Sequence, residues 1–274
     1  MNHTALRAGL IGLATLFSIA AQADQLADIR KKGELIVGVL GSDEPNSFID
    51  PATREIVGYD VDLARAIAQK IGVKLTIKPM SVAARIPELT EGRVDLLAAS
   101  LTHTKEREAK IDFSLTTLVT GQKVMVRKDS GVTALPQLAG KKVVTVKGGT
   151  QEINFRAAVP NANLVTFDTT GQALIALRQG KGVAYVNDEF SIIDDFAKLG
   201  PQQKDFQVLD KNLSVEPIAL GLRKNEPGFR ALVNDTLKQL EASGNAEQLF
   251  LKWYGPTTRL KVPKRSFKIE TDKV

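Results

Sequence analysis

A run of hydroxyl and basic side chains between Asp95 and Arg107 has the composition of an anion-binding site. An apolar segment, expected to be a strand, ends at Ser100 and Thr102, and a helix is expected to begin just before Arg107. A helix N-terminus carries a partial positive charge, so a cation there is unfavourable by ~0.3–1 kcal/mol unless an anion accompanies it. The planar guanidinium of Arg107 can hold a carboxylate through two parallel hydrogen bonds. The alternative is an ordinary surface arginine that follows an N-cap threonine.

Two further motifs place polar groups at the ends of expected strands. Gly148-Gly149-Thr150 follows a strand and opens a helix, where glycines let backbone N–H groups approach an anion. The motif matches neither the phosphate-loop nor the dinucleotide-binding pattern. Asp188 ends another strand, where its carboxylate can accept hydrogen bonds from an ammonium group. The alternatives are structural, with Thr150 and Asp188 as N-caps of the helices that follow.

The composition excludes several kinds of chemistry. Residues 1–23 have the pattern of an export signal, with Arg7, an apolar stretch at 8–21 and small residues before Asp24. Removing them takes away one positive charge, so the formal +6 becomes +5, and leaves His103 as the single histidine. Because the chain has no cysteine either, no metal, no cofactor and no cysteine nucleophile are expected. No later segment approaches the ~20 apolar residues of a membrane span, so an exported, soluble protein is expected.

Most of the excess positive charge lies in a C-terminal tail at 257–274. Its acidic residues are Glu270 and Asp272. Its basic residues are Arg259, Lys261, Lys264, Arg265, Lys268 and Lys273. The tail lacks the interleaved aromatic residues of a nucleic-acid-binding element, so no nucleic-acid partner is expected. We expect it to wrap the first of the two lobes described next, or to remain mobile.

Short apolar runs alternate with segments of helical periodicity, which predicts an α/β fold. In the first half, strands are expected at 34–39, 74–78 and 95–99, and helices at 61–71 and 86–89. The second half repeats this alternation. Strands are expected at 141–146, 164–167, 183–186 and 217–222, and helices at 151–159, 171–178, 190–199 and 228–243. The pattern predicts two lobes joined by crossings at 117–123 and 214–218. The first lobe would comprise 24–118 plus 218–256 and the second 119–217, with a ligand site in the cleft between them.

Seven segments, taken in order, resemble the family-3 bacterial extracellular solute-binding proteins, the polar amino-acid-binding components of ABC importers. They are residues 33–38 (Gly-Glu-Leu-Ile-Val-Gly), 57–63 (Val-Gly-Tyr-Asp-Val-Asp-Leu), 85–89 (Arg-Ile-Pro-Glu-Leu), 91–95 (Glu-Gly-Arg-Val-Asp), 100–107, Gly149-Thr150 and 182–188 (Gly-Val-Ala-Tyr-Val-Asn-Asp). The resemblance implies a type II periplasmic binding-protein fold, in which each lobe is a mixed sheet flanked by helices and two crossings form a hinge. It also implies a monomer in the periplasm that hands its ligand to a membrane permease.

The resemblance assigns the ends of a free amino acid to particular residues. It implies that Arg107, with Ser100, Thr102 and Thr150, holds the α-carboxylate, and that Asp188 holds the α-ammonium group. Opposite charges at a fixed separation select an α-amino acid over a sugar or a simple anion.

Arg85 is the residue that favours an acidic ligand. It stands where glutamate- and aspartate-binding relatives have an arginine that reaches the second carboxylate of the ligand, so the resemblance implies glutamate or aspartate. The alternative is a surface ion pair between Arg85 and Glu88 or Glu91.

Three other positions depart from the glutamate- and aspartate-binding pattern. Leu40 and Thr170 stand where those relatives can carry a further basic residue and a histidine, and Asp43 stands where aromatic rings are common. Asp43 would favour a basic or an uncharged polar ligand instead.

Two other functions use the same fold. Periplasmic cyclohexadienyl (arogenate) dehydratases share a Gly-Gly-Thr segment and need a general acid beside the departing hydroxyl. Glu152 and Glu189 are candidates for that acid, but each is also an ordinary first-turn helix acid. Receptor sensor modules and the leading domains of lytic enzymes would need a further domain or a span, which we do not expect here. A binding protein without catalysis is therefore the expectation.

Overall fold

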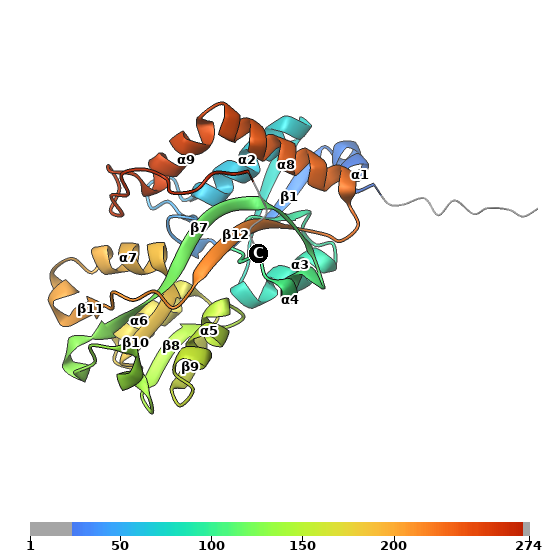
Figure 1. The fold of residues 1–274 in the computed structure, drawn as a ribbon. Helices are drawn as coiled ribbons and strands as arrows, with labels where there is room; N and C mark the ends of the chain where they lie inside the picture. The colour runs from blue at the N-terminus through green and yellow to red at the C-terminus, as the bar shows by residue number, and fades with distance from the viewer. Residues whose placement is uncertain (1–23, 271–274) are drawn as a thin grey trace, which may run out of the picture.

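Two long strands connect two lobes that lie one above the other (Figure 1). The computed structural model describes residues 24–270, so the expected export signal at 1–23 lies outside the described residues. The long strands are β7 (Asp112–Arg127) and β12 (Val215–Leu222), which pair side by side in antiparallel fashion. Their pairing shifts register between Ile218 and Ala219 and again before Gly221. The expected crossings at 117–123 and 214–218 fall on this strand pair.

The first lobe holds both ends of the described chain. Its helices are α1 (Gln25–Lys32), α2 (Tyr59–Ile71), α3 (Arg85–Thr90), α4 (Lys105–Glu108), α8 (Pro227–Ala242) and α9 (Asn245–Tyr254). Its strands are β1 (Glu34–Val39), β2 (Ser42–Asp43), β3 (Ser47–Ile49), β4 (Ile56–Val57), β5 (Lys74–Pro79) and β6 (Leu96–Leu97). The second lobe contains α5 (Thr150–Ala158), α6 (Thr170–Arg178), α7 (Glu189–Lys198), β8 (Lys142–Val146), β9 (Asn163–Phe167), β10 (Ala184–Asp188) and β11 (Phe206–Val208).

Hydrogen bonds join the strands of both lobes into one mixed sheet. Its order is β5-β1-β6-β12-β7-β10-β8-β9, with β11 paired to β7, while β2, β3 and β4 form a separate small sheet. The lobes therefore do not have two unconnected sheets, because β7 runs through both. Parallel pairing of β1 with β5 and of β8 with β9 is the β-α-β arrangement that the alternating sequence pattern predicts.

Helix α2 shows how the sequence positions the elements around the site. Its buried residues Val61, Ala64, Ile67 and Ala68 recur at helical spacing and face the first-lobe core. Gly72 ends the helix with φ of 84°, a left-handed conformation that costs glycine little. The chain is thereby returned to the sheet as β5.

Several elements were not predicted or differ from prediction. Helices α1 and α9 and the small sheet of β2, β3 and β4 were not predicted. The strand expected at 95–99 is only Leu96–Leu97, and the helix expected before Arg107 is the single turn α4. Beyond this short strand, Ser100 takes φ of 47°, a left-handed conformation that is rare for a non-glycine residue.

The lobes touch across the cleft, so the structure is a closed form. One buried apolar cluster contains Leu40, Val82 and Ala99 from the first lobe together with Val146 and Tyr185 from the second. Three of these residues, Leu40, Val82 and Val146, also line the cavity described below.

The described part of the C-terminal tail lies against the first lobe. Phe267 and Ile269 are buried in the first-lobe core, and the Arg265 side chain, 5% exposed, pairs with Glu241 and Glu247. The basic composition of the tail therefore does not keep this part of it in solvent.

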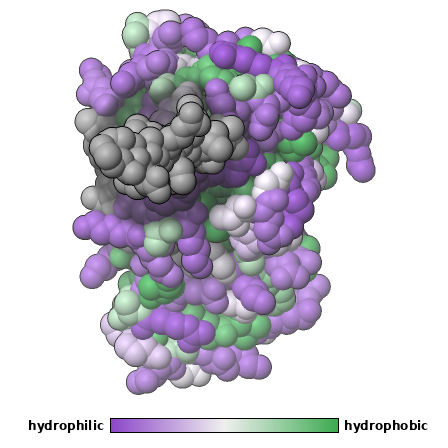
Figure 2. Space-filling model, turned by 90° about the vertical axis from the view of Figure 1, so that its right-hand side faces the viewer, coloured by the Kyte–Doolittle hydropathy of each residue, from purple (hydrophilic) through white to green (hydrophobic). Residues whose placement is uncertain are grey.

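The face drawn in Figure 2 is mainly hydrophilic, with apolar side chains in small groups between polar ones. Among residues 24–270, no helix has the length and apolar character needed to span a membrane.

Candidate functional site

A small cavity of about 20 Å³ between the closed lobes brings all six sequence-predicted site residues together. The first lobe lines it with Leu40, Asp43, Val82, Arg85, Ser100, Thr102 and Arg107. The second lobe lines it with Val146, Gly149, Thr150, Gln151, Thr170, Asn187 and Asp188. More open hollows lie elsewhere, such as one bordered by Arg127, Arg178 and Lys204, but the cavity between the lobes combines convergent charges from both.

Arg107 reaches the cavity from the single turn of α4. Thr104 caps this turn, because its hydroxyl accepts a hydrogen bond from the Arg107 N–H at 3.2 Å. The guanidinium donates to the Thr102 carbonyl at 2.7 Å and, at 3.4 Å, to the Gly148 carbonyl of the second lobe. Three of its five N–H groups are not used in these bonds. The expected alternative, a surface arginine, does not hold, because this side chain lies at the contact between lobes.

Arg85 is buried, and most of its hydrogen-bonding capacity is used inside the protein. Its Nε and Nη1 donate to three first-lobe carbonyls at 2.8–3.0 Å, those of Val82, Ala99 and Ser100. Its Nη2 lies 3.4 Å from the Gly148 carbonyl, so four of five N–H groups have partners. The alternative of a surface ion pair is wrong, since Glu88 pairs with Lys78 and Arg93 instead.

Gly148 brings the second lobe within reach of both arginines. Its carbonyl accepts from Arg85 and Arg107, and its φ is 82°. A Cβ at this position would lie 2.8 Å from the Cα of Ala83 in the first lobe, so only glycine allows this approach. The first glycine of the Gly-Gly-Thr motif is thus a contact point between lobes.

Ser100 donates toward the protein rather than toward the position expected for a ligand carboxylate. Its hydroxyl donates to Asp43 at 2.6 Å, and its N–H donates to Asp60 at 2.9 Å. Asp43 also accepts from Asn46 at 2.9 Å and from Ser191 of the second lobe at 2.9 Å. The left-handed backbone of Ser100 therefore aims two donors at two buried carboxylates.

Thr102 and Thr150 face one another across the lobes, with their hydroxyl oxygens 3.3 Å apart. The Thr150 hydroxyl donates to Glu216 at 3.0 Å and accepts from Gln122 at 2.9 Å. Glu216, on β12, is buried and also accepts from Asn154. Residues of both crossing strands thus hold Thr150 in place, and only the polar character of Gln122 and Glu216 could have marked them in the sequence. Thr150 is the first residue of α5, while Gly149 occupies the N-cap position.

Asp188 occupies the N-cap position of α7, but its side chain does not cap the helix. Its Oδ1 accepts a hydrogen bond from Gln151 at 3.0 Å. Gln151 also donates to Asn187, which in turn donates to Tyr185. The carboxylate is therefore directed into the cavity, and the interpretation of Asp188 as a capping residue is wrong.

Burial is the main influence on the charged groups of the cavity. It raises the pKa of Asp188 to about 8, with Asp43 and Glu216 acting in the same direction and the two arginines opposing. It also raises the pKa of Asp60, which lies behind Ser100, to about 7.

Burial lowers the pKa of Arg85 to about 9, and the positive charge of Arg107 contributes to this shift. The pKa of Arg107 is also lowered, first by burial, while Glu216 and Asp188 oppose the shift. Both guanidinium groups stay charged at neutral pH. The cavity wall thus carries two cations and, in Asp43 and Asp188, two carboxyl groups, of which Asp188 has the raised pKa.

The two-lobed α/β architecture and the charged cavity between its lobes define a type II periplasmic binding protein. A model of the bacterial extracellular solute-binding proteins, family 3, matches residues 35–256. The chain belongs to this family, as its motifs predicted.

Three relatives differ in the ligands that their names state. The chain is 33% identical to a glutamine-binding protein of Geobacillus stearothermophilus, with 78% of this chain and 82% of the relative aligned. It is 30% identical to the glutamate/aspartate import solute-binding protein of Salmonella typhimurium, with 85% and 80% aligned. The crystal structure of the P235GK mutant of ArgBP from T. maritima matches with a TM-score of 0.78 and 31% identity, over 84% of this chain and 99% of that one. Family membership alone does not identify the ligand.

Proposed function

We propose that this protein captures one free L-amino acid between its lobes in the periplasm and delivers it, chemically unchanged, to the permease of an ABC importer. The observation that carries the proposal is the position of Arg107 and Asp188, which line one cavity from opposite lobes. Arg107 keeps donors that its bonds to the Thr102 and Gly148 carbonyls do not use, and Asp188 accepts from Gln151 through one oxygen. The α-carboxylate of the ligand can accept hydrogen bonds from Arg107, and its α-ammonium group can donate to Asp188.

The lobes close by rotating about β7 and β12, with 24–118 plus 218–256 on one side and 119–217 on the other. The register shifts in the β7–β12 pairing support this hinge, because irregular pairing lets strands bend. Closure brings Thr102 to Thr150 and Gly148 to the two arginines. A monomer with this hinge would present its closed form to the permease.

Glutamine is the ligand whose side chain best suits the part of the cavity bordered by Asp43 and Arg85. Asp43 and Arg85 both line it, so an acceptor and a donor are available together. Arg85 has one N–H beyond those on backbone carbonyls, which is too few for a bidentate bond to a second carboxylate. A carboxamide accepts from Arg85 and donates to Asp43 without adding charge. Glutamate would instead face the Asp43 carboxylate, and arginine would face the Arg85 guanidinium.

A thermal-shift screen of ligand-stripped protein against the twenty amino acids tests this proposal. All amino acids are compared at one concentration, about 100 times the Kd of glutamine. Glutamine is then expected to stabilise the protein by ~2.7 kcal/mol and to give the largest shift. A larger shift with glutamate or aspartate would restore the ligand that Arg85 suggested from the sequence. No shift with any amino acid would contradict the proposed function itself.

The absence of catalysis is tested separately. Incubation with prephenate or arogenate is expected to give no aromatic product, because neither Glu152 nor Glu189 is among the residues that line the cavity. Steady turnover would show that the protein is an enzyme.

Affinity is expected to rise with pH up to about pH 8. The raised pKa of Asp188 means that the closed, ligand-free cavity favours the protonated carboxyl below about pH 8, whereas the ammonium group of the ligand favours the carboxylate. Binding at about pH 6 should therefore release up to one proton, and this release should vanish above about pH 8. Calorimetric titrations in buffers of different ionisation enthalpy measure it. Equal affinities and no proton release across this range would contradict the prediction.

A further inference from the structure

The segment after α9 is fixed to the first lobe by its far end. We call residues 255–270 the C-terminal strap. Phe267 and Ile269 are buried in the first-lobe core, and Val262 donates to the Tyr254 carbonyl at 2.9 Å. Thr258 shapes the turn near its start, because its hydroxyl donates to the Gly255 carbonyl and accepts from the Leu260 N–H. The strap therefore moves with the first lobe.

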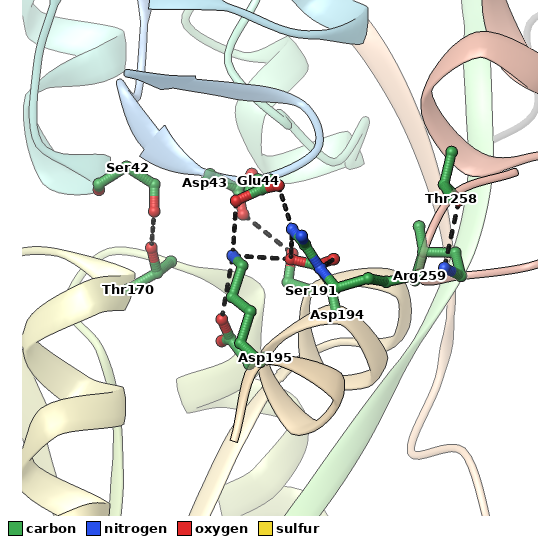
Figure 3. A network of polar contacts seen from close by, with 11 residues as sticks. Ser42, Asp43, Glu44, Thr170, Ser191, Asp194, Asp195, Thr258 and Arg259 are labelled. Carbon is green, nitrogen blue, oxygen red and sulfur yellow. Dashed lines mark hydrogen bonds and ion pairs between the residues drawn. The ribbon is translucent and has the colours of Figure 1, made fainter. Parts of the chain in front are cut away.

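Arg259, on this turn, extends to α7 of the second lobe while also contacting the first lobe (Figure 3). Its Nε donates to the Asp194 carboxylate at 2.7 Å, and its Nη2 contacts Glu44 of the first lobe. Lys198 of α7 lies 2.8 Å from Glu44 and 2.7 Å from Asp194. Each lobe thus contributes one acid and one base to what we call the ion-pair square: Glu44, Arg259, Asp194 and Lys198.

The geometry of the ion-pair square suits a contact that opens and closes. Two of its pairs, Glu44 with Arg259 and Asp194 with Lys198, lie within one lobe, while the other two cross between lobes. When the lobes separate, every charge keeps its partner on its own side. Opening therefore breaks the two crossing pairs without leaving an unpaired buried charge, which would be costly.

The ion-pair square adjoins the ligand cavity through residues 42–44, which are strand β2 and the residue after it. The Ser42 carbonyl accepts from Thr170, and Asp43 accepts from Ser191, both residues of the second lobe (Figure 3). Three consecutive residues of the first lobe therefore bind the second lobe, and the middle one lines the cavity. Contacts made by Glu44 hold this segment, and hence Asp43, in the closed position.

We propose that Arg259 is a positioning residue for ligand retention: from the C-terminal strap it holds α7 against the first lobe, and so slows release of an amino acid it does not touch. This inference rests on the proposed function. It implies that the strap acts on the dissociation rate rather than on the contacts of the ligand.

Exchange of tritiated L-glutamine against an unlabelled excess tests the proposal by measuring the dissociation rate. At about 0.01 M ionic strength, where the Debye length is about 30 Å, Arg259→Ala is expected to release ligand about two- to fivefold faster than wild type, the size expected of a part-exposed ion pair. At about 1 M, where screening acts over about 3 Å, the difference between the two rates should be smaller. Lys268→Ala removes a strap cation that is 70% exposed and pairs with Glu270 on the same segment, so its rate should match wild type.

The coupling is tested with Asp194→Asn. If Arg259 acts through Asp194, the double variant should release ligand no faster than the faster single variant. An unchanged rate in Arg259→Ala, or an increase that is the same at both ionic strengths, would overturn the proposal, because a merely structural effect of the strap does not depend on salt in this way. Failure of the proposed function is distinct, since wild-type protein would then retain no amino acid.

Discussion

Replacing Arg107 by alanine is expected to abolish binding of every amino acid, with a loss of affinity of about 100-fold or more. Two charge-assisted hydrogen bonds to an α-carboxylate, each worth ~1.5–3 kcal/mol, account for a loss of this size. The α-carboxylate is common to all amino acids, so the loss should not depend on the ligand. Isothermal titration with glutamine, glutamate and arginine measures it.

A matched control for Arg107 lies on the same helical turn. Lys105 is exposed and does not line the cavity, so Lys105→Ala should leave each Kd unchanged. On the other lobe, Asp188→Asn removes the charge that receives the ammonium group and should also weaken every ligand, while Glu189→Gln, one residue on, should not. A variant without Arg107 that still binds any amino acid as tightly as wild type would contradict the carboxylate role.

The sequence located the site because its signals are local. Hydroxyl, glycine and charged residues at the ends of apolar runs marked Ser100, Thr102, Arg107, Thr150 and Asp188, and strand ends on the two sides of a cleft meet in this fold. The direction of each hydrogen bond was not predictable in the same way. The hydroxyls of Ser100 and Thr150 donate to Asp43 and Glu216, which lie 57 and 66 residues away in the chain.

The crossing strands show why some site residues were missed. Gln122 and Glu216 stand in segments whose polar character suggests exposed connections, yet both are buried. They are covered because β7 and β12 lie in the middle of the shared sheet, where both side chains contact Thr150 and Asn154 of α5. Only the arrangement of the lobes, which no local pattern contains, places these side chains beside Thr150.

For a different reason, the sequence left open whether the C-terminal strap wraps the first lobe, as its described part does, or stays mobile. It has no helical or strand periodicity, and its lysines and arginines resemble a solvated tail. Its two buried apolar residues, Phe267 and Ile269, are too few to give a periodic signal. The pairing of Arg265 with Glu241 and Glu247 depends on helices α8 and α9 lying next to the strap, which is a tertiary property.

Arg85→Ala is expected to lower the free energy of unfolding of the ligand-free protein by about 3 kcal/mol or more. The variant leaves the buried carbonyls of Val82, Ala99 and Ser100 without their donor, at ~1–3 kcal/mol for each unsatisfied group. Denaturant titration measures the loss. Arg93→Ala is the control, because Arg93 is 44% exposed, pairs only with surface carboxylates and should cost less than about 1 kcal/mol. If both variants were equally stable and Arg85→Ala lost glutamate or aspartate binding alone, the guanidinium would serve the ligand rather than the backbone, and the acidic-ligand interpretation of the sequence would be the better one.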